Sequence, residues 1–133
     1  MRRPTAHAGM RHVALCVKDL AACERFYGEL LGMQVEWRPD ADNVYLTSGA
    51  DNLALHRVTT EFAPNENQHL DHIGFILREP AQVDDWHEFL KTNGVEIVKA
   101  PRTHRDGARS FYCRDPDGNT VQMIYHPPIA NAG

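Results

Sequence analysis

Two stretches of the chain alternate between apolar residues and polar or small ones in the same way. They comprise residues 12–17 and 71–77, and each has a histidine at or next to its first position. A period of two residues predicts half-buried β-strands. The histidines, His12 and His72, lie 60 residues apart, which indicates that one module occurs twice in the chain.

Each predicted strand is followed by the pattern of an amphipathic helix. In the first half Asp19 is a candidate N-cap, and Gly32 stands where a glycine commonly ends a helix. In the second half Pro80 opens the helix and Gly94 closes it, 62 residues after the first glycine. The apolar faces of the two helices comprise Leu20, Cys23, Tyr27 and Leu30 in the first half and Val83, Trp86 and Leu90 in the second.

Three further strands are predicted in each half. They comprise residues 33–38, 43–47 and 53–58 in the first half and residues 95–99, 110–114 and 120–125 in the second. The sequence Asp-Pro-Asp-Gly-Asn at residues 115–119 predicts a hairpin turn between the last two strands. Residues 100–108 contain Pro101, Gly107 and several charged side chains, which predict a surface loop. The predicted parts are an N-terminal tail (1–9), a first βαβββ module (10–58), a linker (59–69), a second βαβββ module (70–127) and a C-terminal tail (128–133).

The composition narrows the functional classes. With 133 residues, a formal charge of −4 and a pI near 6.0, the chain lacks the basic face that nucleic-acid binding requires. No apolar run is long enough to span a membrane, and the N-terminus lacks the apolar segment of a secretory signal. Cys16, Cys23 and Cys113 fit no Cys-x-x-Cys pattern and indicate reduced thiols. We therefore expect a cytoplasmic protein that acts on a small molecule and has neither a nucleic-acid partner nor a membrane partner.

The alternation also predicts which residues share the sheet faces that point away from the helices, because successive side chains of a strand point to opposite sides. His12, His56, His72 and Gln122 fall on those faces, one on each of four strands. The small residues beside them, which leave room for a ligand, are Ala14, Ala54 and Gly74. A shift of one residue in the strand register would turn His56 to the opposite face. The four polar side chains are therefore candidate ligands of one site.

Several motifs along the chain resemble those of a known superfamily. They comprise the His12 strand ending in Lys18-Asp19-Leu20, then Phe26-Tyr27, Leu31-Gly32-Met33, Asp71-His72-Ile73-Gly74-Phe75, and Phe111-Tyr112 before the turn at 115–119. In these motifs residues 10–127 resemble the vicinal oxygen chelate superfamily, which includes glyoxalase I, extradiol dioxygenases, fosfomycin-resistance proteins and bleomycin-binding proteins. The resemblance implies an α+β fold of paired βαβββ modules, whose curled mixed sheets surround a cleft with the helices outside.

The resemblance also implies a divalent metal ion held by the first and last strands of the modules. The matching residues are His12, His56, His72 and Gln122. Glyoxalase I-like members typically have glutamate at both last-strand positions, and dioxygenases and fosfomycin-resistance proteins typically use two histidines and one glutamate, so Gln122 departs from each of these patterns. A neutral amide removes a negative ligand, which weakens metal binding or favours Zn²⁺, Ni²⁺ or Co²⁺, while Mn²⁺ and Fe²⁺ stay candidates.

Two functions from different classes remain open. The first is a metal-dependent enzyme of the glyoxalase or dioxygenase type, either a lyase, an isomerase or a dioxygenase, that chelates a small anionic substrate through neighbouring oxygens. Gln122 cannot act as the base that glutamate provides in glyoxalase I, so His56 and His104 are the candidate bases. The second is a metal-free small-molecule binding protein of the bleomycin-resistance type.

Two roles are open for the predicted loop at residues 100–108. As a lid over the cleft, the loop and the residue after it would bring Arg105 or Arg109 to an anionic group of the substrate. As a solvated polar loop it would have no such role.

The resemblance also implies an oligomeric state. Family members of this two-module size form homodimers, and in the matching arrangement one subunit would supply His12 and His56 and the other His72 and Gln122. We therefore expect a homodimer.

Overall fold

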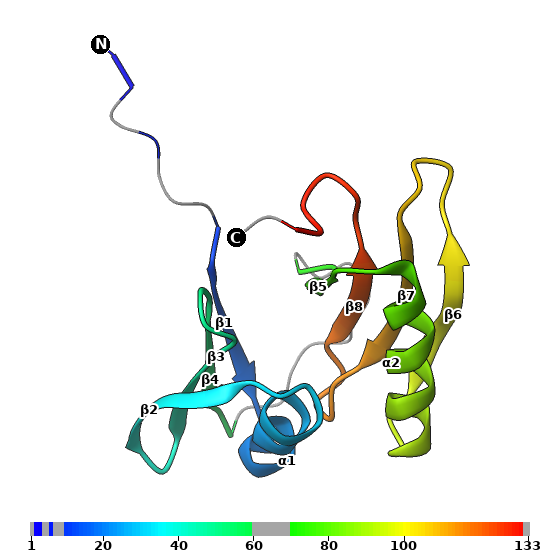
Figure 1. Ribbon diagram of the computed structural model, residues 1–133. Coiled ribbons are helices and arrows are strands. Elements are labelled where there is room, and N and C mark those ends of the chain that lie inside the picture. Colours follow the sequence, from blue (N-terminus) through cyan, green and yellow to red (C-terminus); the bar gives the residue numbers. More distant parts are fainter. Residues whose placement is uncertain (1, 4–5, 7–9, 60–69, 132–133) are drawn as a thin grey trace. The chain divides into compact units, whose positions relative to one another are not determined.

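The described residues contain two four-stranded sheets with the same strand order (Figure 1). The computed structural model describes residues 2–3, 6, 10–59 and 70–131, and the chain divides into two units, Met1–Thr59 and Thr60–Gly133. The expected linker at residues 59–69 lies outside the described residues except for Thr59, as does most of the expected tail at residues 1–9.

The first unit contains strands β1 (His12–Val17), β2 (Gln34–Asp40), β3 (Asn43–Thr47) and β4 (Asn52–Arg57). Their order in the sheet is β1-β4-β3-β2, and only the β1–β4 pair is parallel. Helix α1 (Leu20–Glu24) continues directly into the π-helical segment η1 (Arg25–Leu30) between β1 and β2. The Asp19 side chain accepts a hydrogen bond from the backbone N–H of Ala22, which confirms the predicted N-cap.

The second unit repeats this arrangement. Strands β5 (Ile73–Leu77), β6 (Ile97–Thr103), β7 (Arg109–Arg114) and β8 (Thr120–Tyr125) form a sheet of order β5-β8-β7-β6, again with one parallel pair, β5–β8. Helix α2 (Pro80–Thr92) packs on one face of this sheet. It begins with a capping box formed by Glu79 and Gln82, and Gly94, whose φ is 80°, follows its C-cap Asn93. The predicted α+β fold of paired βαβββ modules with mixed sheets is therefore confirmed.

Each sheet buries the face that its helix covers. In the first unit the buried side chains of this face include Leu15, Val17, Val44, Leu46 and Leu55. In the second unit they include Leu77, Phe111, Cys113, Val121 and Met123, which pack with Val83 and Leu90 of α2. The opposite faces carry the polar candidates, as the alternation predicted.

Two predicted elements need correction. The surface loop expected at residues 100–108 is wrong in its first part, because β6 continues to Thr103 and only residues 104–108 form the connection to β7. Pro101 is accommodated because β6 is the edge strand, where one side needs no ladder hydrogen bond. The strand expected at residues 71–77 starts two residues later, at Ile73, so His72 directly precedes it.

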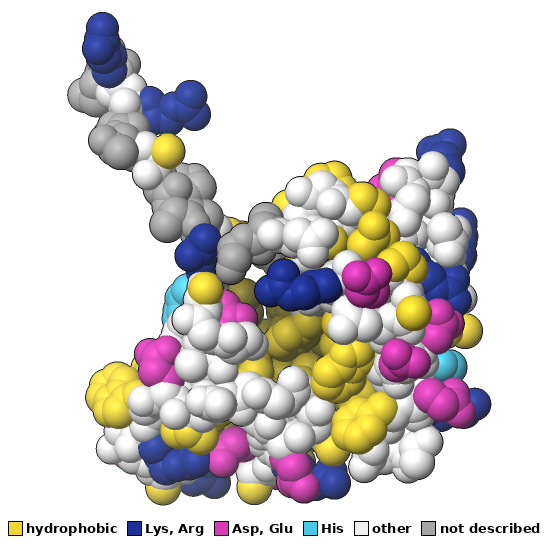
Figure 2. Space-filling model, viewed as in Figure 1, with side chains coloured by type: hydrophobic (Ala, Val, Ile, Leu, Met, Phe, Trp, Pro, Cys, Tyr) yellow, Lys and Arg dark blue, Asp and Glu magenta, His cyan; other side chains and the backbone are white. Residues whose placement is uncertain are grey.

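The surface mixes both signs of charge. Figure 2 shows Lys and Arg side chains interspersed with Asp and Glu over the face in view, instead of gathered into one patch. Several are paired at close range, for example Arg57 with Asp42 at 2.6 Å and Arg114 with Glu96 at 2.8 Å. Within the described ranges, no helix is both long and apolar enough to cross a membrane.

Candidate metal and substrate site

Gln122 is the polar centre of the open face of the second sheet. It lies on β8 opposite Gly74 of β5, and only 9% of it is exposed. Its amide Nε2 donates hydrogen bonds to the hydroxyls of Ser110, at 3.1 Å, and Tyr112, at 3.0 Å, both on the neighbouring strand β7. The amide oxygen Oε1 points the other way, since it lies 3.8 Å from the place where a β-carbon on Gly74 would stand. The glycine therefore places no side chain beside a carbonyl oxygen whose orientation is set by two hydroxyl groups.

His72 stands at the entrance of β5 on the same side. Its Nδ1 lies 2.6 Å from the carboxylate of Asp71, so in the neutral ring Nδ1 carries the hydrogen and Nε2 has the lone pair. The imidazole also meets the Tyr112 ring edge to face, with 5.3 Å between the ring centres. Tyr112 thus contacts both His72 and Gln122, and Lys99 Nζ lies 5.7 Å from the centre of its ring.

His104 joins this group through a hydroxyl. Its Nε2 lies 3.3 Å from Ser110 Oγ, which in turn accepts a hydrogen bond from the Gln122 amide. A chain of polar contacts therefore runs from His104 through Ser110 to Gln122. This chain ends at the amide nitrogen of Gln122, so it links His104 to the side of Gln122 that faces away from its oxygen.

The first unit presents His12 in a similar setting. His12 starts β1, and its register partner on β4 is Asn52. The Nδ1 atom lies 2.7 Å from Asn52 Oδ1, and the amide nitrogen of Asn52 donates to Glu36 at 3.4 Å. Because an amide oxygen only accepts hydrogen bonds, Nδ1 carries the hydrogen and Nε2 is the free acceptor.

His56 is on the same face as His12, but the structure does not bring the two together. Its register partner on β1 is Cys16, four residues beyond His12. At about 3.3 Å per residue this places the two histidines roughly 13 Å apart along the strands. Its Nδ1 binds Asn43 Oδ1 at 2.6 Å. His56 is therefore too far from His12 for the two to bind one metal ion.

The two arginines expected to bind substrate occupy different places. Arg109 is on the opposite side of its strand from Ser110 and Tyr112, and its guanidinium binds the Asp84 carboxylate at 2.6 and 3.1 Å. This hydrogen-bonded pairing raises the pKa of Arg109 and lowers the pKa of Asp84. Arg105 lies exposed in the short turn between β6 and β7. The structure therefore places Arg109 against α2 and away from Gln122, and it leaves Arg105 at the surface.

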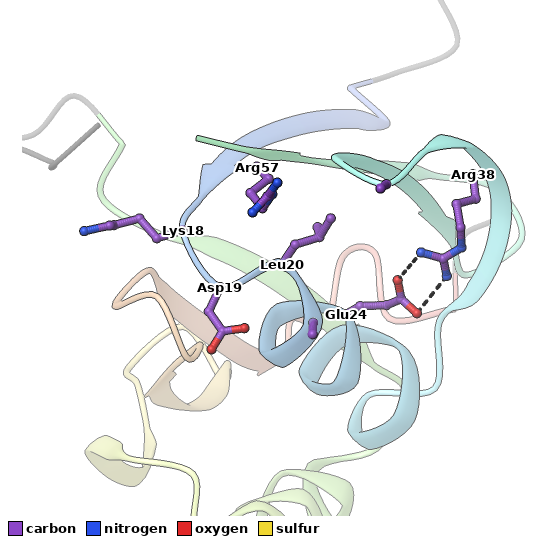
Figure 3. A pocket seen from close by; sticks show the side chains of 8 residues that line it. Lys18, Asp19, Leu20, Glu24, Arg38 and Arg57 are labelled. Carbon is purple, nitrogen blue, oxygen red and sulfur yellow. Dashed lines mark hydrogen bonds and ion pairs between the residues drawn. The ribbon is translucent and has the colours of Figure 1, made fainter. Parts of the chain in front are cut away.

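An open hollow of about 780 Å³ lies on the helix side of the first unit (Figure 3). Its basic residues include Arg38, which binds Glu24 in two contacts at 2.7 and 2.8 Å, and Arg57, which binds Asp42. The close carboxylate raises the pKa of Arg38. These ion pairs already neutralise both arginines, and the hollow is on the face opposite to His12. It is therefore a poor match for the expected anion site.

Among the residues that the structure describes, no three His, Cys, Asp or Glu side chains gather into a group that could hold a metal ion. Each unit instead offers part of a donor set. The first unit offers Nε2 of His12, and the second offers Nε2 of His72 and Oε1 of Gln122.

The matching family model spans residues 9–123 and describes the Glyoxalase/Bleomycin resistance protein/Dioxygenase superfamily. The chain belongs to this superfamily. The metallothiol transferase FosB of Staphylococcus epidermidis is 33% identical to it over 118 residues, which cover 86% of this chain and 79% of that protein. Virulence protein STM3117 of Salmonella typhimurium is 32% identical over 120 residues, which cover 84% of this chain and 80% of that protein. The crystal structure of lactoylglutathione lyase from Agrobacterium tumefaciens shares the fold, with a TM-score of 0.72, 24% identity and coverage of 93% of this chain and 96% of that one.

Sequence reasoning missed the residues that hold the candidate ligands in place. They are Asn52, Asp71, Ser110 and Tyr112. A signal for the last two was present, because the turn at residues 115–119 fixes the pairing of β7 with β8 and so places Tyr112 opposite Gln122. Asp71 was also identifiable as the residue adjacent to His72. Nothing in the sequence pattern pointed to Asn52.

Proposed function

We propose that this protein is a metal-dependent enzyme in which His12, His72 and Gln122 hold one divalent metal ion. The observation that carries the proposal is the hydrogen bonding of the three side chains, which leaves one donor atom of each available to a metal ion. In each side chain the other polar atom is held by a neighbour, which leaves the donor atom available. Partners of this kind orient metal ligands and set the tautomer of a ligating histidine. The donor set of two imidazoles and one amide oxygen suits Zn²⁺, Co²⁺, Ni²⁺ or Mn²⁺.

The substrate is a small anion that presents two neighbouring oxygens. When bound, the metal ion would polarise these oxygens and stabilise negative charge that develops on them. Because all three ligands are neutral, the ion would keep its full charge for the substrate. Tyr112, which binds the Gln122 amide, and Lys99, whose Nζ lies over the Tyr112 ring, would orient the rest of the anion by a hydroxyl and a positive charge.

The reaction we favour is transfer of a thiol to the bound substrate, as the name of the relative FosB indicates for that protein. A thiol has a pKa of about 8.5 in solution and loses its proton far more readily than a carbon atom does, so a histidine such as His104 is a sufficient base. Removal of a proton from carbon needs a stronger and more closely placed base, and the neutral Gln122 does not provide one. Thiol transfer therefore fits this ligand set better than lactoylglutathione lyase chemistry.

Elemental analysis and thermal unfolding test the metal site. Protein purified without an affinity metal should carry close to one equivalent of a transition metal, or should unfold at a higher temperature when Zn²⁺, Ni²⁺ or Mn²⁺ is added. His12→Ala, His72→Ala and Gln122→Ala should each abolish the effect. His56→Ala, a histidine on the same sheet face as His12, should retain it.

A metal-free binding protein is the competing function. Less than about a tenth of an equivalent of metal, with no thermal shift from any added ion, would establish that alternative. Consumption of a low-molecular-weight thiol in the presence of candidate oxyanions then tests the reaction itself. The elemental analysis and the thermal unfolding do not depend on whether the correct oxyanion is among those tested in the thiol assay.

A further inference from the structure

Gly74 leaves a gap, the space that a side chain at this position would fill, in the row of side chains on the open face of β5. His72 stands two residues before it and Ile76 two residues after it, and all three lie on the same side because side chains alternate along a strand. A glycine within a strand commonly marks a bulge, a close approach of another backbone, or the place where a ligand comes near. The geometry around Gly74 distinguishes these cases.

Within the described residues, neither a bulge nor the backbone requires a glycine at position 74. The pairing of β5 with β8 runs from Ile73 to Leu77 without a shift in register. Gly74 is not among the glycines with a positive φ. A β-carbon built on it would lie 3.6 Å from the backbone oxygen of Gln122, which is an ordinary van der Waals contact. Alanine would therefore fit here, and it weakens a strand less than glycine does.

A polar atom without a partner among the described residues is aimed at the gap. The Gln122 side chain is nearly buried, and both of its hydrogen bonds to described residues are made by Nε2. No described residue donates a hydrogen bond to Oε1, which lies 3.8 Å from the β-carbon position of Gly74. The oxygen is an acceptor and is thus open to an atom that enters from outside the chain.

The other boundary of the gap is apolar. The Cγ2 methyl of Ile124 lies 3.7 Å from the same β-carbon position. Ile124 is the register partner of Ile76, which is 44% exposed, so two isoleucine side chains stand beside the gap on the side away from His72. Along β5 the open face therefore changes from an imidazole, through the space over Gly74, to a pair of aliphatic side chains.

We propose that Gly74 is a specificity-determining residue, and that the substrate is an oxyanion with a short aliphatic chain that lies over Gly74 against Ile124 and Ile76. The inference rests on the proposed function for the position of the oxygens, which would lie beside His72 and Gln122. Removal of the chain from water supplies the selectivity. A β-carbon at residue 74 would occupy the space of the chain, but it would stay at an ordinary contact distance from Oε1.

Binding of three 2-oxo acids of increasing chain length tests the proposal, because each presents two neighbouring oxygens. Isothermal titration calorimetry on zinc-loaded protein should show tighter binding from pyruvate to 2-oxobutyrate to 2-oxovalerate, by about fourfold for each methylene that leaves water. Gly74→Ala should abolish this gradient, because one methyl group in a closely bounded site changes binding by about tenfold or more.

Metal binding separates this proposal from the proposed metal site. In competition with a chromogenic chelator, Gly74→Ala should bind Zn²⁺ as tightly as the wild type does, because the new methyl leaves Oε1 accessible. A wild type that takes up no metal would refute the metal site alone. The three acids are then titrated into the metal-free protein, where the same gradient and its loss in Gly74→Ala are expected, because the apolar contacts do not involve the ion.

A compensating variant distinguishes a filled gap from a damaged fold. Thermal unfolding should show Gly74→Ala to be at least as stable as the wild type. Ile124→Ala, added to Gly74→Ala, removes the facing methyl and should restore part of the affinity for 2-oxovalerate, whereas independent damage at two sites would add.

Three results would overturn the proposal. The first is a wild-type affinity that does not rise with chain length, and absence of binding by all three acids counts in the same way. The second is a wild-type gradient in Gly74→Ala. The third is loss of the dimer in Gly74→Ala by sedimentation, which would place a partner chain over Gly74 instead of a substrate.

Discussion

Gln122 is the residue on which the chemistry of the proposed metal site depends most. A carboxylate at this position would bring charge to a metal ion, whereas the amide brings only an oxygen dipole. The structure shows that this oxygen is aimed, because the Ser110 and Tyr112 hydroxyls hold the amide nitrogen. The same hydroxyls can rotate to donate hydrogen bonds, so a carboxylate would find partners here as well.

Gln122→Glu should therefore tighten metal binding. The added negative charge is expected to raise affinity by about tenfold or more, equivalent to roughly 1.4 kcal/mol. Competition with a chromogenic chelator measures this change for Zn²⁺, Ni²⁺ and Mn²⁺. Ser110→Ala is the matched variant, since it removes one hydroxyl and adds no charge, and it should not tighten binding. Equal affinities of wild type and Gln122→Glu for all three ions would place residue 122 outside the metal site.

Residue positions were predictable where alternation alone decides them. His12, His56 and Gln122 fall on the open faces of their sheets, as the period of two indicated. Alternation predicts the face on which a residue lies, but it does not predict the register between neighbouring strands. In the register of β1 with β4, His56 lies opposite Cys16 and far from His12. Arg109 was misjudged for a related reason. It starts β7, so strand geometry turns it toward Asp84.

At the scale of elements, the edge strands β2 and β6 explain why the loop predicted at residues 100–108 was partly wrong, and they share features that belong to the internal repeat. β2 and β6 each carry a proline, Pro39 and Pro101, 62 residues apart like the glycines that end the helices. Each strand also pairs with its neighbour through two irregularities in register. Proline and charge predict a loop from local sequence, and only the sheet order reveals that an edge strand tolerates them. The hairpin turn and the helix ends were predictable because their residues act locally.

The turn at residues 115–119 should contribute measurably to stability. The Asp115 carboxylate is 4% exposed and accepts hydrogen bonds from the backbone N–H of Asp117 and from both the backbone and side chain of Asn119. Asp115→Ala leaves these donors unpaired, which should lower the free energy of unfolding by about 2–3 kcal/mol.

Urea unfolding measures the effect of Asp115→Ala, and the chain offers a matched comparison. Asp106 also accepts a backbone hydrogen bond two residues on, from Ala108, but it is exposed at the turn between β6 and β7. Asp106→Ala should cost less than about 1 kcal/mol. Similar losses for both variants would contradict a special role for the buried turn.

The whole molecule is a duplication in which the two copies have come to differ in chemistry. Both units have the same strand order and one parallel pair, yet the open face of one carries two histidines and a cysteine and that of the other carries the Gln122 network. The proposed metal site needs ligands from both copies. In that proposal each copy supplies too few donors to hold an ion by itself, so loss of the ligand from either copy should release the metal.

The sheet edges indicate how copies of this chain would associate. β2 and β6 are protected against pairing by proline and by irregular register. The other two edge strands, β1 and β5, contain no proline, and exposed apolar side chains lie at or near them, including Met10, Leu70 and Ile76. A net charge of −4 opposes association only weakly. We therefore expect a twofold symmetric homodimer that uses the edges at β1 and β5.

Sedimentation equilibrium should give twice the chain mass of 15.1 kDa at tens of micromolar. Ile76→Lys adds a charge to the open face of β5, where the isoleucine is 44% exposed, and should shift the protein toward monomer. Val98→Lys makes the same kind of change on the protected strand β6, where the valine is 37% exposed, and should leave the dimer intact. If one subunit supplies His12 and the other supplies His72 and Gln122, the Ile76→Lys monomer should also lose its metal, because neither chain then presents three ligands to one ion. A wild-type monomer that keeps its metal would contradict both the dimer and the shared site.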